Sequence, residues 1–218
     1  MTTPPSTPSS THRLPTDTDD GLLLIISGPS GVGKTTITRG VERSIADSVF
    51  SVSCTTRART TVDVEGVDYH FVTDDEFEAM KARGEFLETA GVYGKKYGTP
   101  KGPVLEHLRR GRLVILEIDV QGAIQVKQQV PVAFAVFIKP PSEQELLRRL
   151  RERKREGSDQ IEKRFRAATQ EMHLAETCGV YDVFLVNDTI DHSIKLAVEV
   201  VQAERKLRRE RSTPRPRP

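Results

Sequence analysis

The segment from Gly28 to Thr35 reads GPSGVGKT and matches G-x-x-x-x-G-K-[ST] at every fixed position. Glycines let the backbone curl so that successive N–H groups converge on an anion, and the start of a following helix adds partial positive charge. In such a loop the amine of Lys34 can reach the β- and γ-phosphates of a nucleoside triphosphate, and the hydroxyl of Thr35 can bind Mg²⁺. A glycine-rich turn with a surface lysine is the simpler alternative. The complete match favours triphosphate binding.

This loop needs a strand before it and a helix after it, and the surrounding sequence predicts both. Four near-continuous apolar runs predict buried strands at 22–27, 113–118, 132–138 and 181–186. Helical patterns between them predict helices at 34–47, from 142 onward, at 159–177 and at 189–210, and residues 142–145 match a capping box. Strands without alternation, separated by helices, predict an α/β fold with helices on both faces of a parallel sheet.

The pattern changes between residues 50 and 98. Short stretches at 50–53, 69–72 and 86–92 predict strands, and a helix cap is expected at 73–76. Short strands with glycine-containing connections predict a small mixed sheet inserted into the parallel domain.

Composition indicates a well-solvated surface. Hydrophobic residues make up 36% and charged residues 29% of the chain, and no apolar run approaches the roughly 20 residues that span a bilayer. Residues 1–20 are rich in Pro, Ser and Thr without an apolar stretch, so we expect a disordered tail and no secretory signal. Cys54 and Cys178 have no metal-ligand spacing, so a reduced pair in the cytoplasm is expected; one disulfide is the alternative.

The C-terminal residues 205–218 carry seven Arg or Lys residues and one acidic residue, Glu210. A basic end of this kind can contact nucleic acid. Because no aromatic residue is interleaved there for base stacking, a solvated helix end is favoured. We therefore expect neither a membrane nor a specific nucleic-acid partner. The sequence indicates no oligomeric state.

Further motifs follow the phosphate loop in a fixed order. They are Ser53-Cys54-Thr55-Thr56-Arg57, Gly66-Val67-Asp68-Tyr69-His70-Phe71, Glu85-Phe86-Leu87-Glu88, Tyr97-Gly98-Thr99-Pro100, Leu116-Glu117-Ile118-Asp119-Val120-Gln121-Gly122 and Val186-Asn187-Asp188. Together with the loop, this ordered set resembles the guanylate kinase family over residues 22 to 200. The resemblance implies the reaction ATP + GMP ⇌ ADP + GDP, with Mg²⁺ accompanying ATP.

The resemblance also implies a three-layer phosphate-loop core, a GMP-binding insert and a helical lid. The expected divisions are a tail at 1–20, a guanylate-kinase-like domain at 21–204 and a basic tail at 205–218. Within the domain, the core comprises 21–50, 99–141 and 166–204, the insert comprises 51–98, and the lid comprises 142–165. Lid and insert are expected to close over ATP and GMP and to expel water that would otherwise hydrolyse ATP.

The family match assigns guanine recognition to Glu88, because one carboxylate can accept hydrogen bonds from guanine N1–H and the 2-amino group together. Adenine lacks the N1–H and would be rejected. Ser53 and Thr99 match hydroxyls that contact the base, whereas Tyr69 and Tyr97 match tyrosines that bind the GMP phosphate. Without the resemblance, an exposed strand glutamate and half-buried sheet tyrosines are the simpler interpretations.

The remaining assignments concern charge. Arg57 matches the first phosphate-binding arginine, and a planar guanidinium suits a phosphate because it donates two parallel hydrogen bonds. Asp119, at the end of a strand, matches a carboxylate near the metal and the acceptor. The expected catalytic residues are Lys34, Arg57, Arg149, Arg153, Arg164 and Asp119. The expected ATP contacts are Gly28, Pro29, Ser30, Gly31, Val32, Gly33, Lys34, Thr35, Thr36 and Asn187, and Thr35 is the expected metal ligand. The expected GMP contacts are Ser53, Arg57, Arg59, Tyr69, Glu88, Tyr97, Thr99, Glu117 and Asp119.

The chain departs from the family pattern beside Arg57. The family has a second arginine three positions later, but position 60 is Thr, and Asp63 stands where a glutamate is usual. We expect Arg59 to take over this second contact to the GMP phosphate through an altered loop.

Three other functions remain open from the sequence. Another nucleoside monophosphate kinase would share the phosphate loop but not Glu88 with Ser53 and Thr99. A guanylate-kinase-like module that binds phosphopeptides would keep the fold, yet such modules tend to lose phosphate-loop residues that are present here. A phosphate-loop regulatory protein could use the basic tail.

Overall fold

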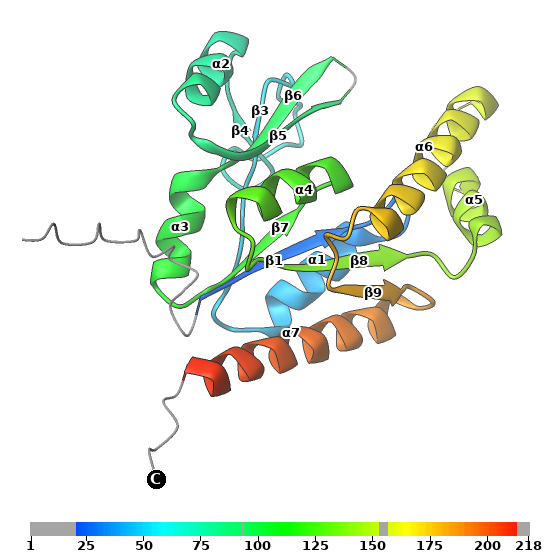
Figure 1. Ribbon diagram of the computed structural model, residues 1–218. Helices are drawn as coiled ribbons and strands as arrows, with labels where there is room; N and C mark the ends of the chain where they lie inside the picture. Colours follow the sequence, from blue (N-terminus) through cyan, green and yellow to red (C-terminus); the bar gives the residue numbers. More distant parts are fainter. Residues whose placement is uncertain (1–20, 93, 153–156, 213–218) are drawn as a thin grey trace, which may run out of the picture.

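The computed structural model describes residues 21–92, 94–152 and 157–212 of the chain. Its centre is a five-stranded sheet in the order β2-β7-β1-β8-β9, in which all neighbouring strands are parallel (Figure 1). The strands are β1 (Leu22–Ser27), β2 (Ser48–Phe50), β7 (Leu113–Glu117), β8 (Phe134–Lys139) and β9 (Val183–Val186). The four strands predicted from apolar runs are confirmed, with shifts of one or two residues at their ends.

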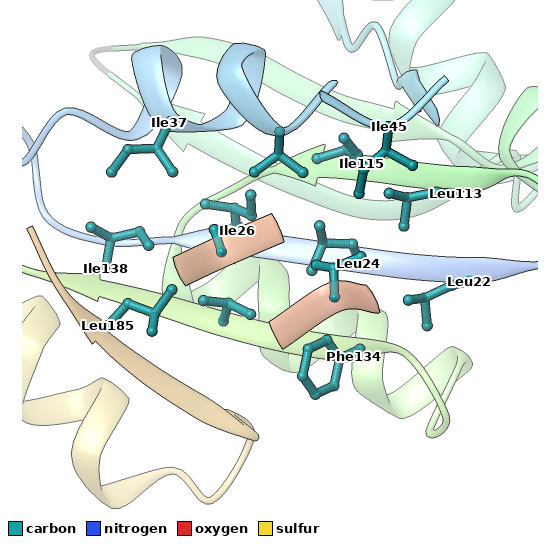
Figure 2. Close-up of a cluster of buried hydrophobic side chains, with 14 of the residues drawn as sticks. Leu22, Leu24, Ile26, Ile37, Ile45, Leu113, Ile115, Phe134, Ile138 and Leu185 are labelled. Carbon is teal, nitrogen blue, oxygen red and sulfur yellow. The ribbon is translucent and has the colours of Figure 1, made fainter. Parts of the chain in front are cut away.

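Helices cover both faces of this sheet, as the continuous apolar strands predicted. Leu22, Leu24 and Ile26 of β1 face α1 (Lys34–Ser44) and α7 (Ile190–Ser212) in one buried cluster (Figure 2). Leu23 and Ile25 of the same strand join a second cluster with α3 (Lys101–Arg109) and α4 (Val120–Gln129). Successive side chains of a strand point to opposite faces, so one strand supplies two cores. The result is a three-layer α/β core.

The prediction of an insert strand at 50–53 is wrong. The residues Ser48–Phe50 instead form β2, the edge strand of the core sheet, which pairs with β7. The N–H of Ser51 still donates to the carbonyl of Ile115, 2.9 Å away, so the chain follows β7 beyond the end of β2. Four alternating residues were too few to reveal which sheet they join. Helix α1 also ends earlier than predicted, because Ile45 has extended backbone angles.

The insert is a separate four-stranded mixed sheet in the order β4-β3-β6-β5, at the top of Figure 1. Its elements are β3 (Cys54–Thr55), β4 (His70–Phe71), α2 (Asp74–Ala82), β5 (Phe86–Val92) and β6 (Lys95–Pro100). The predicted cap of α2 is a complete capping box between Thr73 and Glu76. In β5, Phe86 packs on Phe77 within the insert, whereas Leu87 belongs to the core. The pairing register shifts at this point, between Phe86 and Glu88.

The predicted lid, residues 142–165, contains α5 (Glu143–Glu152) and the first part of α6 (Ser158–Thr177), which continues beyond it. The two helices pack through residues such as Leu146 and Ala168. Half of the capping box predicted for α5 is present, because the hydroxyl of Ser142 accepts a hydrogen bond from the N–H of Glu145 at 3.1 Å. The carboxylate of Glu145 binds the side chains of Arg148 and Arg149 instead of the cap. Among the described helices, none is long and apolar enough to cross a membrane.

Candidate active site

The phosphate loop joins β1 to the start of α1. Gly31 and Gly33 have φ angles of 90° and 98°, a left-handed conformation that other residues rarely adopt, and Gly33 precedes the first residue of α1. No side chain caps this helix, so its first N–H groups are open to an anion. The amine of Lys34 donates to the carbonyls of Gly28 and Pro29. The loop is therefore folded as an anion cradle, with its lysine lying across it.

Thr35 meets the end of the neighbouring strand β7. Its hydroxyl donates to Oε1 of Glu117 at 2.7 Å. The other oxygen of Glu117, Oε2, is buried and has no hydrogen-bond partner among the described residues. A hydroxyl beside a carboxylate with a free oxygen is the kind of ligand set that Mg²⁺ prefers. The described ranges contain no group of three or more His, Cys, Asp or Glu side chains that could hold a metal.

The residues predicted for ATP binding converge on this loop. The amide of Asn187 is almost fully buried, donates to the carbonyl of Val32 at 2.6 Å and accepts from Ser193 at 2.9 Å. Arg149 reaches the carbonyl of Asn187 at 3.1 Å. A cavity of about 410 Å³ lies beside them, lined by Gly31, Val32, Gly33, Arg149, Glu152, Asn187, Asp188 and Ile190. Asn187 thus ties the strand end of β9 to the phosphate loop.

A second predicted arginine also contacts the loop. Arg164, in the first half of α6, donates to the hydroxyl of Ser30 at 2.7 Å. Thr36 is exposed in the first turn of α1. The predicted catalytic residue Arg153 lies outside the described residues.

The predicted guanine-binding carboxylate is buried in the insert. Glu88 on β5 is 5% exposed and accepts a hydrogen bond from the hydroxyl of Thr99, 2.6 Å away on β6. Burial, together with the charge of the nearby Asp119, raises the pKa of Glu88 to about 7. A buried carboxylate with one strong hydrogen bond keeps acceptor capacity for another ligand. Ser53 is half-buried before β3, and its carbonyl accepts from the N–H of His70.

Arg57 lies between aromatic rings and an acidic side chain. Its guanidinium donates two hydrogen bonds of 2.9 Å to the carboxylate of Asp63 and lies 5.3 Å from the ring centre of Tyr69. The rings of Tyr69 and Tyr97 are 5.7 Å apart, edge to face. The predicted phosphate-binding residues therefore form one cluster.

Thr60 and Asp63, the two residues that depart from the family pattern, are hydrogen-bonded to each other. Oδ2 of Asp63 also accepts from the N–H and the hydroxyl of Thr60, at 2.7 and 2.6 Å. The hydrogen bonds from Arg57 and Thr60 hold the pKa of Asp63 well below its usual range. Arg59 donates to the backbone carbonyl of Asp63 at 3.0 Å on the exposed loop. Thr60 thus holds the loop through both its backbone N–H and its hydroxyl, which bind Asp63.

Asp119 is not at the end of a strand, as the sequence had suggested. The strand β7 ends at Glu117, and Asp119 is the N-cap of α4, accepting from the N–H of Gly122 at 2.8 Å. The apolar run continues from the strand into the loop after it, and an aspartate three residues before Gly122 is also typical of a helix N-cap. Sequence reasoning also missed Glu171 on α6, a largely buried carboxylate seven residues after Arg164.

The chain is similar in sequence and structure to known guanylate kinases. The family model described as guanylate kinase matches residues 21–204. A guanylate kinase of Paramagnetospirillum magneticum is 46% identical over 92% of this chain and 92% of that protein, and one of Carboxydothermus hydrogenoformans is 43% identical over 85% and 89%. The crystal structure of guanylate kinase from Anaplasma phagocytophilum is 32% identical, with a TM-score of 0.67 over 85% of this chain and 86% of that chain. The chain therefore belongs to the guanylate kinase family and is an ATP:GMP phosphotransferase.

Proposed function

We propose that the phosphate loop holds ATP with Mg²⁺, that the insert at 51–98 holds GMP, and that the lid at 142–165 encloses the ATP phosphates. The observation that carries this proposal is the burial of the Glu88 carboxylate, which is hydrogen-bonded to Thr99 and forms no ion pair with a basic side chain of the described residues. A carboxylate in this setting is costly unless a ligand with paired donors binds it. Guanine has such a pair in its N1–H and 2-amino group.

On the ATP side, we assign the N–H groups of the loop and Lys34 to the phosphates, and Asn187 to the adenine end. Arg149 and Arg164, which already contact Asn187 and Ser30, neutralise charge on the transferred phosphoryl group. We assign the same role to Arg153. Thr35 and Glu117 fit Mg²⁺, because Oε2 of Glu117 is buried without a partner beside the Thr35 hydroxyl. When bound, Mg²⁺ supplies positive charge to the β- and γ-phosphate oxygens.

On the GMP side, Arg57, Tyr69 and Tyr97 bind the phosphate, and Ser53 with Thr99 supports the base. The acceptor atom is a phosphate oxygen that is already anionic near neutral pH, so the site needs no strong general base. Its residues work by alignment and by neutralising charge. Asp119 lies near Glu88 at the start of α4 and is assigned to the acceptor side.

We further propose that Arg59 leaves the Asp63 carbonyl and donates to the GMP phosphate when GMP binds. The change Arg59→Ala is then expected to remove a charged hydrogen bond of about 1.5–3 kcal/mol and to weaken GMP binding about 10- to 150-fold. The matched control is Arg83→Ala, since Arg83 is an exposed arginine of the insert that forms an ion pair with Glu85. An unchanged KM for GMP in Arg59→Ala refutes this assignment.

The experiment for the function as a whole is a coupled assay of ADP release with GMP, AMP and UMP as acceptors, with and without Mg²⁺. We expect ADP release to require GMP and Mg²⁺, and Glu88→Gln to lower kcat/KM for GMP about 10- to 150-fold through the loss of charged hydrogen bonds. The control Glu85→Gln changes an exposed carboxylate three residues earlier and keeps the activity. Equal rates with AMP and GMP contradict the assignment of Glu88. A cytoplasmic location stays a prediction.

A further inference from the structure

Glu171 is a buried carboxylate to which no role has been assigned so far. It lines a cavity of about 410 Å³ between α4 and α6, together with Asp119, Val120, Gln121, Gln170 and Leu174. Its Oε1 is buried and has no hydrogen-bond partner among the described residues. Because such an orphaned oxygen costs free energy, its retention at the junction of two helices calls for a function.

On one side, Glu171 belongs to the helix that contacts the ATP site. It follows Arg164 by seven residues, which is two helical turns, so both side chains leave α6 on the same face. Arg164 donates to Ser30 in the phosphate loop at 2.7 Å. The nearby Lys34 acts on the same carboxylate: burial raises the pKa of Glu171 to about 7, and Lys34 opposes this rise. Glu171 therefore lies on the helix face that contacts the phosphate loop, and its carboxylate is influenced by the charge of Lys34.

On the other side, Glu171 faces the first turn of α4. The backbone N–H of Val120, the first residue of α4, lies close enough to lower its pKa. This N–H belongs to a helix start, where partial positive charge favours a carboxylate. Val120 and Ala168 also belong to the same buried cluster, which packs α4 against α6. The start of α4 therefore depends on α6 for both packing and charge.

Helix α4 in turn fixes the strand that carries Glu88. The side chain of Gln125 hydrogen-bonds both the N–H and the carbonyl of Thr89 at 3.0 Å, and Gln129 donates to the carbonyl of Leu87 at 2.7 Å. These bonds hold the residues on either side of Glu88. Gly122, in the first turn of α4, lies directly beside the carboxylate of Glu88. A Cβ atom on this glycine would lie 3.1 Å from Oε2 of Glu88, so the absence of a side chain leaves room for the carboxylate. The carboxylate of Glu88 thus rests against the first turn of α4.

We propose that Glu171 is a positioning residue that couples the two substrate sites, by linking α6, fixed by ATP through Arg164, to α4, which fixes Glu88. This inference rests on the proposed division of the site into an ATP side and a GMP side. It follows a continuous chain of contacts, from Ser30 through α6 and α4 to β5, rather than proximity alone. Coupling of this kind is reciprocal, so ATP tightens GMP binding by the same factor by which GMP tightens ATP binding.

The test measures that factor directly. Calorimetry gives the Kd of GMP alone, the Kd of adenylyl imidodiphosphate with Mg²⁺ alone, and the Kd of GMP at saturating analogue. The parent chain is expected to show a coupling factor of about 5 or more, within the usual range for linked sites. In Glu171→Ala the factor falls toward 1, while each ligand alone binds within about twofold of the parent value. Glu171→Gln keeps an acceptor for the Val120 N–H but not the charge, and is expected to lie between the two.

The matched control is Glu176→Gln, on the same helix, where the carboxylate binds Lys139 on the surface at 2.5 Å. It is expected to keep the full factor. A factor in Glu171→Ala equal to that of the parent overturns the proposal, as does a parent chain without coupling. Weaker binding of each ligand alone with an unchanged factor also overturns it, because Glu171 then only maintains the fold. If Glu171→Ala fails to fold, the factor in Glu171→Gln decides in the same way. Binding of neither ligand to the parent chain would instead refute the assignment of the two sites.

Discussion

The buried Glu88 predicts that GMP binding weakens as the pH falls through 7. In the proposed site, guanine donates its N1–H and 2-amino hydrogens to the two oxygens of the ionised Glu88 carboxylate, and burial raises the pKa of Glu88 to about 7. Between pH 8 and pH 6 the ionised fraction of a group with this pKa falls from about 90% to about 10%, so its contribution to GMP affinity falls about tenfold. The GMP phosphate, with a second pKa of about 6, adds a smaller loss of about twofold at pH 6.

The stability of the GMP-free protein depends on pH in the opposite direction. Because the pKa of Glu88 in the folded chain is raised above the unfolded value, this residue contributes stability that is fully present below the unfolded pKa. That contribution is lost as the pH rises through about 7. GMP therefore binds best under conditions in which the empty guanine site is least stable.

The assay is calorimetric titration with GMP at pH 6, 7 and 8, in the parent chain and in Glu88→Gln. The variant has no titrating group at this position, so its remaining pH dependence reports the phosphate alone. The change in GMP affinity between pH 6 and pH 8 in the parent chain, divided by the same change in Glu88→Gln, gives the contribution of the Glu88 carboxylate. This ratio is expected to be about ten. Equal pH dependence in the two proteins refutes the reasoning, because the carboxylate would then be ionised throughout or not bound to the base.

The remaining predictions concern the fold, and each is checked by urea unfolding. In Gly40→Ala the new Cβ would lie 2.4 Å from the side chain of Ile194 on α7, so this side chain or the helices must shift, at a cost of about 1–3 kcal/mol; unchanged stability contradicts this close packing. Arg205→Ala removes two hydrogen bonds to the half-exposed Asp47, at 2.8 and 2.6 Å, and is expected to lower stability by about 1 kcal/mol or less. This difference should vanish as the pH falls through the pKa of Asp47, which Arg205 lowers, and its persistence in acid would rule out the ion pair. Phe137→Ala empties a fully buried site and is expected to cost about 3–5 kcal/mol, so a loss below 1 would show that the core collapses around it.

The sequence predicted features that depend on short-range patterns. The phosphate loop, the strand 22–27 and the following helix are encoded within about 25 consecutive residues, by apolar continuity and by glycines at fixed spacing. The buried strands have no polar alternation because helices cover both of their faces. In these segments the local sequence pattern and the overall fold favour the same structure, so the sequence alone was sufficient to predict the elements.

Features that depend on distant partners were not predictable in the same way. The carboxylate of Asp63 is occupied by Arg57 and Thr60 only because the loop folds back on itself, which no spacing rule states. Asp119 lies outside β7 because a helix begins immediately after it. Glu171 meets Val120 from another helix, about 50 residues away in the sequence, and only the packing of α6 on α4 brings them together.

The shift of register in β5 has a consequence for the order of events during substrate capture. Phe86 packs in the small insert and Leu87 in the main core, so this peptide unit, next to Glu88, is one place where the two parts meet. An irregularity of this kind serves as a pivot, because points near a rotation axis travel least and points far from it travel most. Glu88 lies next to this irregularity, whereas Arg57 and Tyr69 lie elsewhere in the insert. In the proposed closure of the insert over GMP, Glu88 would therefore move less than Arg57 and Tyr69, so the base can be bound before the phosphate is enclosed.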